Sequence, residues 1–157
     1  MCSCSISLTL TSPEDTARLA LALAPHLNAG DVILLEGPIG AGKSFFARAL
    51  ILSLLTTPED IPSPTFTLVQ TYDAPKFDIW HCDLYRLITP YEVQELGLED
   101  AFETALCLVE WPDRLGDLTP AEALVISLQI TDAPQERRVT LCATDPRWCP
   151  VLEGLDV

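Results

Sequence analysis

The segment Gly37–Ser44 has the residue types and the spacing of a phosphate-binding loop. It reads Gly-Pro-Ile-Gly-Ala-Gly-Lys-Ser and fits the P-loop pattern G-x-x-x-x-G-K-[ST]. Glycines in such a loop let backbone N–H groups point inward around phosphate oxygens, where side chains would collide. Lys43 is expected to bridge the β- and γ-phosphates, and the Ser44 hydroxyl is expected to bind Mg²⁺. The alternative is an ordinary strand–turn–helix connection.

A P-loop site also needs an acidic side chain near Mg²⁺, usually at the end of a neighbouring buried strand. Glu110 follows four apolar residues, Leu106–Val109, and so meets this requirement. It could also be an exposed carboxylate at a strand end without a further role. Trp111 comes next, and its ring could be part of the core or a lid over the phosphates.

The segment His81–Arg86 (His-Cys-Asp-Leu-Tyr-Arg) combines several reactive side chains. In a strand, residues 81, 83 and 85 point to one side, which would bring imidazole, carboxylate and phenol together. Asp83 could then position a water molecule or hold Mg²⁺ through water, and Arg86 could offset phosphate charge. A strand end with a core histidine explains the same pattern.

A loop with two hydroxyl side chains, Ser63-Pro-Thr65, follows the P-loop helix. Switch loops that sense the γ-phosphate occupy this position in other nucleotide-binding proteins. The loop could equally be a rigid turn that Pro62 and Pro64 shape.

Apolar patterns and turn residues predict the elements that carry these side chains. The predicted strands are Ile6–Leu10, Val32–Leu35, Phe66–Tyr72, Phe77–Cys82, Leu106–Val109, Leu124–Ile130 and Arg138–Ala143, and the predicted helices are Pro13–Asn28, Lys43–Leu55 and Pro90–Ala105. This order predicts an α/β fold, with a mixed, mostly parallel sheet flanked by helices and a strand-rich C-terminal half. We expect a single domain over residues 1–157, with a loosely held tail from residue 150.

The third predicted helix is strongly acidic. Glu92, Glu95, Glu99 and Glu103 would line one face of it, provided that Gly97 does not break the helix. Such a face is usually solvated, and the alternative is a docking surface for a basic partner.

Composition restricts the function classes further. The chain of 157 residues has 23 acidic and 9 basic side chains, for a net charge of −14, and only two lysines. This balance disfavours direct nucleic-acid binding, which relies on basic side chains. No apolar run approaches the roughly 20 residues of a membrane span.

The six cysteines form no C-x-x-C pair and follow no signal peptide, so we expect free thiols in the cytoplasm.

These motifs together resemble one family, TsaE (formerly YjeE), the bacterial ATPases of tRNA threonylcarbamoyladenosine biosynthesis. The resemblance covers about residues 6–143. It is carried by the P-loop, by Ser63-Pro-Thr-Phe-Thr-Leu-Val69, by His81–Arg86, by Glu95-Leu-Gly-Leu98 and by Cys107-Leu-Val-Glu-Trp-Pro112.

The resemblance implies that the chain binds ATP or ADP with Mg²⁺ and hydrolyses ATP slowly when alone. It implies two protein partners, a threonylcarbamoyl-transferase subunit and its inactive paralogue. The implied phosphate-binding residues are Gly37, Ile39, Gly40, Ala41, Gly42, Lys43 and Ser44. Ser44 and Glu110 would hold Mg²⁺, Asp83 would serve hydrolysis, Thr65 would be a switch residue, and Trp111 would lie beside the nucleotide.

The family also places groups of the first helix and the late strands around the adenine. Here these would be Ser12–Glu14 and Arg137 or Arg138. Two positions depart from the family pattern: Pro38 replaces a common acidic residue, and Ser44 replaces the more frequent threonine. A regulatory module without turnover and a small P-loop kinase or GTPase remain alternatives, although the guanine-reading motif N-K-x-D does not occur in the sequence.

Overall fold

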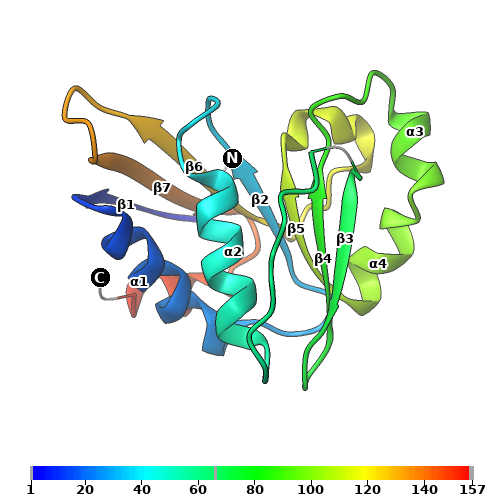
Figure 1. Cartoon of the computed structure of the whole chain (residues 1–157), viewed down its shortest axis with the longest axis horizontal. Helices are drawn as coiled ribbons and strands as arrows, with labels where there is room; N and C mark the ends of the chain where they lie inside the picture. Colours follow the sequence, from blue (N-terminus) through cyan, green and yellow to red (C-terminus); the bar gives the residue numbers. More distant parts are fainter. Residues whose placement is uncertain (1, 66, 156–157) are drawn as a thin grey trace.

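The computed structural model describes residues 2–65 and 67–155, which form one seven-stranded sheet with helices packed against it (Figure 1). The strands are β1 (Cys4–Leu10), β2 (Val32–Glu36), β3 (Val69–Asp73), β4 (Asp78–Asp83), β5 (Leu106–Glu110), β6 (Leu124–Ile130) and β7 (Arg137–Ala143). The helices are α1 (Pro13–Leu23), α2 (Lys43–Leu54), α3 (Pro90–Glu95), α4 (Leu98–Thr104) and α5 (Trp148–Glu153), with 3-10 helices η1 (Ala24–His26) and η2 (Pro112–Leu118).

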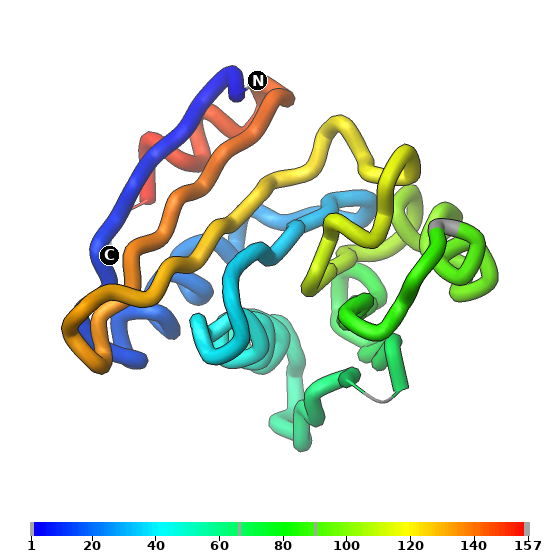
Figure 2. The backbone as a smooth tube through the Cα atoms, turned by 90° about the horizontal axis from the view of Figure 1, so that it is seen from above, coloured from blue at the N-terminus to red at the C-terminus, as the bar shows by residue number. Residues whose placement is uncertain are grey.

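The strand order β1-β7-β6-β2-β5-β4-β3 divides the sheet into two halves. In the parallel half, β2 pairs with β5, and β5 pairs with β4, while β3 adds an antiparallel edge strand. In the antiparallel half, β7 lies between β1 and β6, as the view from above shows (Figure 2). A parallel ladder between β2 and β6 joins the halves. The predicted α/β fold with a mixed sheet is confirmed.

Both faces of the central strand β2 are covered, which explains its continuous apolar sequence. Ile33 and Leu35 belong to a core cluster with the buried side chains of α1 and α2. Val32 and Leu34 face the other side of the sheet, where the cluster includes side chains of α3 and α4. The predicted strand Val32–Leu35 is thus confirmed and extends to Glu36.

Several predicted boundaries shift. The first helix ends at Leu23 and continues as η1, because Pro25 cannot donate the backbone hydrogen bond that an α-helix needs. The first hairpin strand begins at Val69, after Leu68 with a φ of +69°. Phe66, predicted to start that strand, lies outside the described residues.

The condition for a common acidic face is not met, because Gly97, with a φ of +80°, breaks the helix into α3 and α4. Glu92 is not simply solvated either. Its carboxylate accepts hydrogen bonds from the backbone N–H groups of Ile88 and Thr89, at 2.7 and 3.3 Å, and so caps the start of α3. Glu99 and Glu103 belong to α4.

The predicted loose tail from residue 150 is also wrong for the described part of it. Residues 148–153 form α5, which packs on β1 and β7 through the buried side chains of Trp148 and Leu152. The indole N–H of Trp148 donates to the carbonyl oxygen of Glu122 at 2.9 Å. Residues 156 and 157 lie outside the described part. Across the described residues, no helix is both long and apolar enough to cross a membrane.

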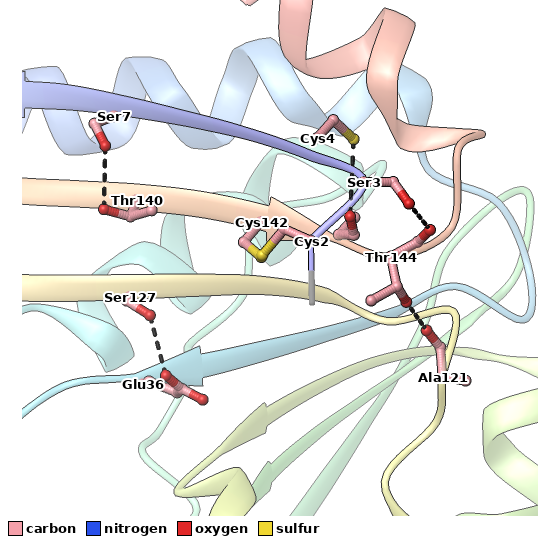
Figure 3. The surroundings of a disulfide bond; sticks show 11 residues. Cys2, Ser3, Cys4, Ser7, Glu36, Ala121, Ser127, Thr140, Cys142 and Thr144 are labelled. Carbon is pink, nitrogen blue, oxygen red and sulfur yellow. Dashed lines mark hydrogen bonds between the residues drawn. A yellow bond between two sulfur atoms is a disulfide. The ribbon is translucent and has the colours of Figure 1, made fainter.

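The expectation of free thiols is wrong for two of the six cysteines. Cys2 and Cys142 form a disulfide, with Cα atoms 5.8 Å apart (Figure 3). The antiparallel pairing of β1 with β7 brings them together across 140 residues of sequence, which no local pattern indicates. Cys82 and Cys107 are free and buried, as predicted from their apolar surroundings.

Candidate nucleotide-binding site

The predicted P-loop connects β2 to α2 at the carboxyl edge of the parallel strands. Gly37 has a φ of +143°, and a Cβ atom there would lie 2.5 Å from the carbonyl oxygen of Leu128. Gly42 has a φ of +105° and precedes α2, whose first turn receives no side-chain cap from the described residues. The N–H groups of this turn therefore remain available for a phosphate.

Lys43 is buried within this loop. Its ammonium group donates to the carbonyl oxygens of Gly37 and, at 3.4 Å, Pro38. It also lies over the indole ring of Trp111, 3.7 Å from the ring centroid. Burial lowers the pKa of Lys43, while the nearby carboxylates of Glu110, Asp83 and Asp113 act in the opposite direction. The loop thus holds the ammonium group of Lys43 beside the space where phosphate oxygens are expected.

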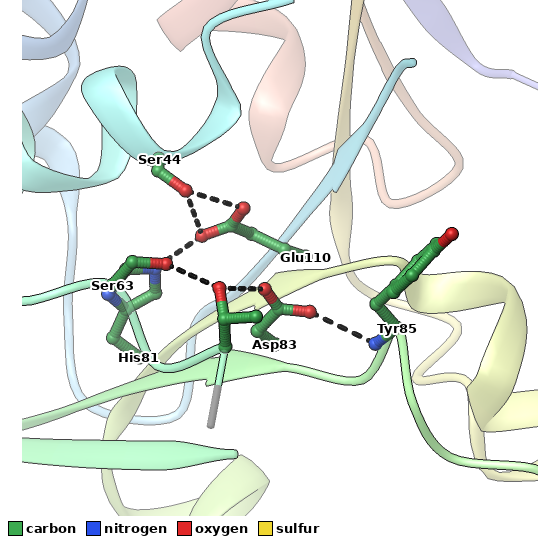
Figure 4. Close-up of polar contacts among 7 residues, drawn as sticks. Ser44, Ser63, His81, Asp83, Tyr85 and Glu110 are labelled. Atoms are coloured by element: carbon green, nitrogen blue, oxygen red, sulfur yellow. Dashed lines mark hydrogen bonds and ion pairs between the residues drawn. The ribbon is translucent and has the colours of Figure 1, made fainter. Parts of the chain in front are cut away.

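Ser44, Glu110 and His81 form one hydrogen-bonded group (Figure 4). The Ser44 hydroxyl lies 2.9 and 3.1 Å from the two carboxylate oxygens of Glu110. Oε2 of Glu110 also lies 2.7 Å from Nε2 of the fully buried His81. Glu110 is therefore not an exposed strand-end carboxylate, since it is 2% exposed and has two side-chain partners.

Asp83 forms a second group with the loop that precedes β3. The Thr65 hydroxyl lies 3.3 Å from Oδ2 of Asp83 and 2.8 Å from the Ser63 hydroxyl (Figure 4). Asp83 pairs in register with Glu110 on the neighbouring parallel strand. Two carboxylates thus lie side by side at the strand ends, next to Lys43.

The predicted common face of residues 81, 83 and 85 holds only for the first two. β4 ends at Asp83, and the backbone N–H of Tyr85 donates to Oδ1 of Asp83 at 3.0 Å. The Tyr85 ring points away from the carboxylates and packs on Trp111, with ring centroids 4.8 Å apart (Figure 4). Arg86 donates through Nε to the carbonyl oxygen of Thr65 at 3.0 Å, so it supports the loop.

A cavity of about 430 Å³ opens between these groups. Of the predicted site residues, it is lined by Ile39, Gly40, Gly42, Lys43, Ser44, Thr65, Asp83, Glu110 and Trp111. Phe45 and Arg48 also line it and were not predicted. Arg48 lies one helical turn after Ser44, so the i, i+4 spacing on α2 is a signal that could have found it.

The late strands reach the P-loop through one of the two predicted arginines. Arg137 donates to the carbonyl oxygens of Ala41 at 3.2 Å and Gly40 at 3.3 Å. Arg138 is exposed, and as the next residue along β7 it points to the other side of the sheet. Ser12 caps α1 by accepting from the N–H of Asp15 at 3.3 Å, two residues after Leu10, which pairs with Arg137.

The donors at this edge suit a magnesium–phosphate group. Mg²⁺ prefers oxygen ligands and is usually held by one or two carboxylates together with phosphate oxygens. The Ser44 hydroxyl and the Glu110 carboxylate are oxygen donors beside the open first turn of α2. The residues present therefore fit this ion.

Comparison of the sequence with known proteins identifies one family. Residues 10–139 match the model of a family described as threonylcarbamoyl adenosine biosynthesis protein TsaE. A protein named tRNA threonylcarbamoyladenosine biosynthesis protein TsaE from Rickettsia bellii is 43% identical over 123 residues, which is 78% of this chain and 85% of the relative. The protein of the same name from Bacillus subtilis is 34% identical over 145 residues, which is 92% of this chain and 89% of the relative.

A solved structure supports the same assignment. The crystal structure of Bacillus subtilis YdiB superimposes with a TM-score of 0.78 at 29% identity, covering 96% of this chain and 93% of that chain. The sequence and fold similarities each extend well beyond the P-loop. The chain belongs to the TsaE family.

Proposed function

We propose that this protein is an ATP-binding and ATP-hydrolysing subunit required for the threonylcarbamoyladenosine modification of tRNA. The observation that carries the proposal is the convergence of Lys43 and Ser44 with Glu110 and Asp83 around one cavity. Membership of the TsaE family supplies the tRNA-modification context. We further propose that residues 1–157 act as a single P-loop domain.

The P-loop would hold the phosphates of ATP. Backbone N–H groups from Gly37 to Ser44 and the first turn of α2 would donate to phosphate oxygens. Lys43, which now donates to the carbonyl oxygens of Gly37 and Pro38, would exchange these acceptors for the β- and γ-phosphates. Trp111 would cover the lysine on its other side.

Ser44 and Glu110 would hold Mg²⁺, with Asp83 contributing through water. The bound ion would neutralise charge on the phosphate oxygens. Asp83 would orient the water that attacks the γ-phosphorus and accept a proton from it, while ADP leaves. Thr65 hydrogen-bonds to Asp83, so its loop is placed to respond to the γ-phosphate.

The adenine end of the nucleotide would lie toward the antiparallel half. Arg137 contacts the P-loop carbonyls, and Ser12–Glu14 follow the strand that pairs with it. These positions support an adenine site at Ser12–Glu14 and Arg137. Arg138 is exposed and lies on the opposite side of the sheet from the P-loop contacts of Arg137.

The proposed partners are a threonylcarbamoyl-transferase subunit and its inactive paralogue, in the cytoplasm. A net charge of −14 disfavours direct contact with tRNA, because phosphates repel an acidic surface. We therefore propose that the protein acts on the transferase complex rather than on tRNA itself.

Single-turnover hydrolysis of ATP, with and without the partner proteins, tests this proposal. We expect partner-stimulated ADP formation, and we expect Asp83→Asn to slow it about 10²- to 10⁴-fold while ATP still binds. Unchanged hydrolysis in this variant would remove Asp83 from the mechanism. Binding without partner-dependent turnover would instead indicate a regulatory module.

Depletion of the protein in its source organism tests the pathway separately. The tRNA nucleosides would be measured by mass spectrometry. We expect threonylcarbamoyladenosine to fall, and an unchanged level would contradict the proposed role.

A further inference from the structure

The site contains a buried histidine that the proposed mechanism does not use. His81 lies on β4, two residues before Asp83, and is 0% exposed. Its side chain points to the same side of the sheet as Asp83, in the row that begins with the core residue Ile79. A purely apolar residue would continue this row of the core. The imidazole instead contacts a carboxylate.

The two ring nitrogens of His81 have different surroundings. Nε2 lies 2.7 Å from Oε2 of Glu110, whereas Nδ1 has no hydrogen-bond partner among the described residues. A proton on Nδ1 would be a buried donor without an acceptor, which is costly. A proton on Nε2 makes a hydrogen bond to Glu110. The surroundings therefore select the tautomer with the proton on Nε2.

This hydrogen bond restricts how the Glu110 carboxylate can turn. Ser44 has one hydroxyl proton and lies within 3.1 Å of both carboxylate oxygens, so it does not distinguish between them. His81 contacts Oε2 alone. With Oε2 engaged in this way, Oε1 is left as the oxygen that faces Ser44 at 2.9 Å.

We propose that His81 is a positioning residue that orients Glu110 for divalent-metal binding at the P-loop. The inference rests on the proposed function, since it needs Glu110 to be a metal ligand. Hydrogen bonds behind a metal ligand commonly contribute 10- to 100-fold to metal affinity. His81 supplies such a bond from a fully buried position.

Three substitutions separate positioning from simple packing. His81→Gln places an amide N–H near the position of Nε2 and keeps the bond to Glu110. His81→Asn is polar but shorter, so its amide cannot reach that carboxylate. His26→Gln is the matched control, because His26 is the other histidine of the chain and is exposed in η1.

The first measurement is the affinity for Mn²⁺, a paramagnetic probe for the magnesium site, by electron paramagnetic resonance in the presence of ADP. We expect His81→Asn to weaken Mn²⁺ binding about 10- to 100-fold. His81→Gln and His26→Gln should stay within about threefold of the unchanged chain. ADP affinity without metal, measured in EDTA, should stay within about threefold in every variant. Normal Mn²⁺ affinity in His81→Asn would overturn the inference, as would an equal loss in His81→Gln.

Glu110→Gln distinguishes failure of this inference from failure of the proposed function. If Glu110→Gln binds Mn²⁺ normally, the proposed metal site is wrong. If Glu110→Gln binds weakly and His81→Asn binds normally, only the positioning role is wrong. In the double variant we expect His81→Asn to add no further loss, because both changes act through one carboxylate. Additive losses of Mn²⁺ affinity in the double variant would contradict a role of His81 that acts through Glu110.

A metal-free measurement applies even if His81→Asn does not fold. ¹⁵N-edited NMR of the unchanged chain should show the His81 proton on Nε2, and the Nε2 signal should shift in Glu110→Gln. A proton on Nδ1, or a signal that Glu110→Gln leaves unchanged, would overturn the inference.

Discussion

The two halves of the sheet differ in what their strand ends bring together. In the parallel half, β2, β5 and β4 run in the same direction, so their carboxyl ends meet at one edge. The P-loop, Glu110 and Asp83 each follow or end one of these strands. In the antiparallel half, β7 runs against both β1 and β6, so no edge collects the ends of all three strands. Strand direction thus explains why the candidate site lies in one half.

Burial shows the same division. Among the described residues, the buried charged side chains are Lys43, Asp83 and Glu110, and all three lie at the parallel edge. The inward-facing side chains of β6 and β7 are apolar, as in Ile126 and Leu141. Burying charge is costly even when it is paired. The antiparallel half, with its apolar packing and its disulfide, is therefore expected to contribute most to stability and least to nucleotide binding.

The largest expected effect is on stability, from Trp148→Ala in α5. The side chain is 1% exposed and packs in the core beside β1 and β7, so its loss leaves a cavity. We expect the free energy of unfolding to fall by about 3–5 kcal/mol. Urea denaturation at low temperature measures this. The folded fraction should bind ADP normally, and a large loss of ADP affinity in that fraction would contradict the division between the halves.

Lys43→Ala should have the converse effect. Loss of the ammonium group at the P-loop is expected to slow ATP hydrolysis with the partner proteins about 10²- to 10³-fold. Circular dichroism should remain unchanged. Lys76→Ala is the matched control, since Lys76 is the only other lysine and is exposed at the tip of the β3–β4 hairpin. Normal ATP hydrolysis in Lys43→Ala would contradict the assignment of the P-loop as the nucleotide-binding site.

Separation along the chain, rather than the division between the halves, explains which features could be predicted from the sequence. The P-loop and Glu110 depend on residues close together in the chain, where a strand end and a glycine turn are local signals. The glycine at position 97 is a local signal of the same kind, because it indicates a possible break in the helix. The common acidic face needs one continuous helix across that glycine, whereas the chain forms two separate helices, α3 and α4.

Features that depend on pairing between distant segments could not be predicted. The Cys2–Cys142 disulfide requires the β1–β7 register. Trp111, which contacts Lys43 from the end of β5, has a φ of +58°, which is unusual for a large side chain and has no local signal in the sequence. The side-by-side placement of Asp83 and Glu110 likewise requires the β4–β5 register.

The third effect concerns the disulfide. Cys142→Ser should lower the free energy of unfolding by about 2–4 kcal/mol, because the bond closes a loop of 140 residues in the unfolded chain. Urea denaturation without reductant measures this, and reductant should bring the unchanged chain to the level of the variant. Cys149→Ser, at a free cysteine of α5, is the control. Identical unfolding of the unchanged chain with and without reductant would show that the bond contributes nothing.

The smallest expected effect comes from Arg137, where the antiparallel half contacts the site. Its guanidinium group donates to the P-loop carbonyls of Gly40 and Ala41, so Arg137→Ala should weaken ADP binding about tenfold without unfolding the sheet. Arg138→Ala, one residue further along β7, should leave ADP affinity unchanged. Fluorescence titration with a labelled ADP measures both. Equal losses in the two variants would indicate general charge attraction. A loss confined to Arg137→Ala would mean that the antiparallel half contributes to nucleotide binding through this one side chain.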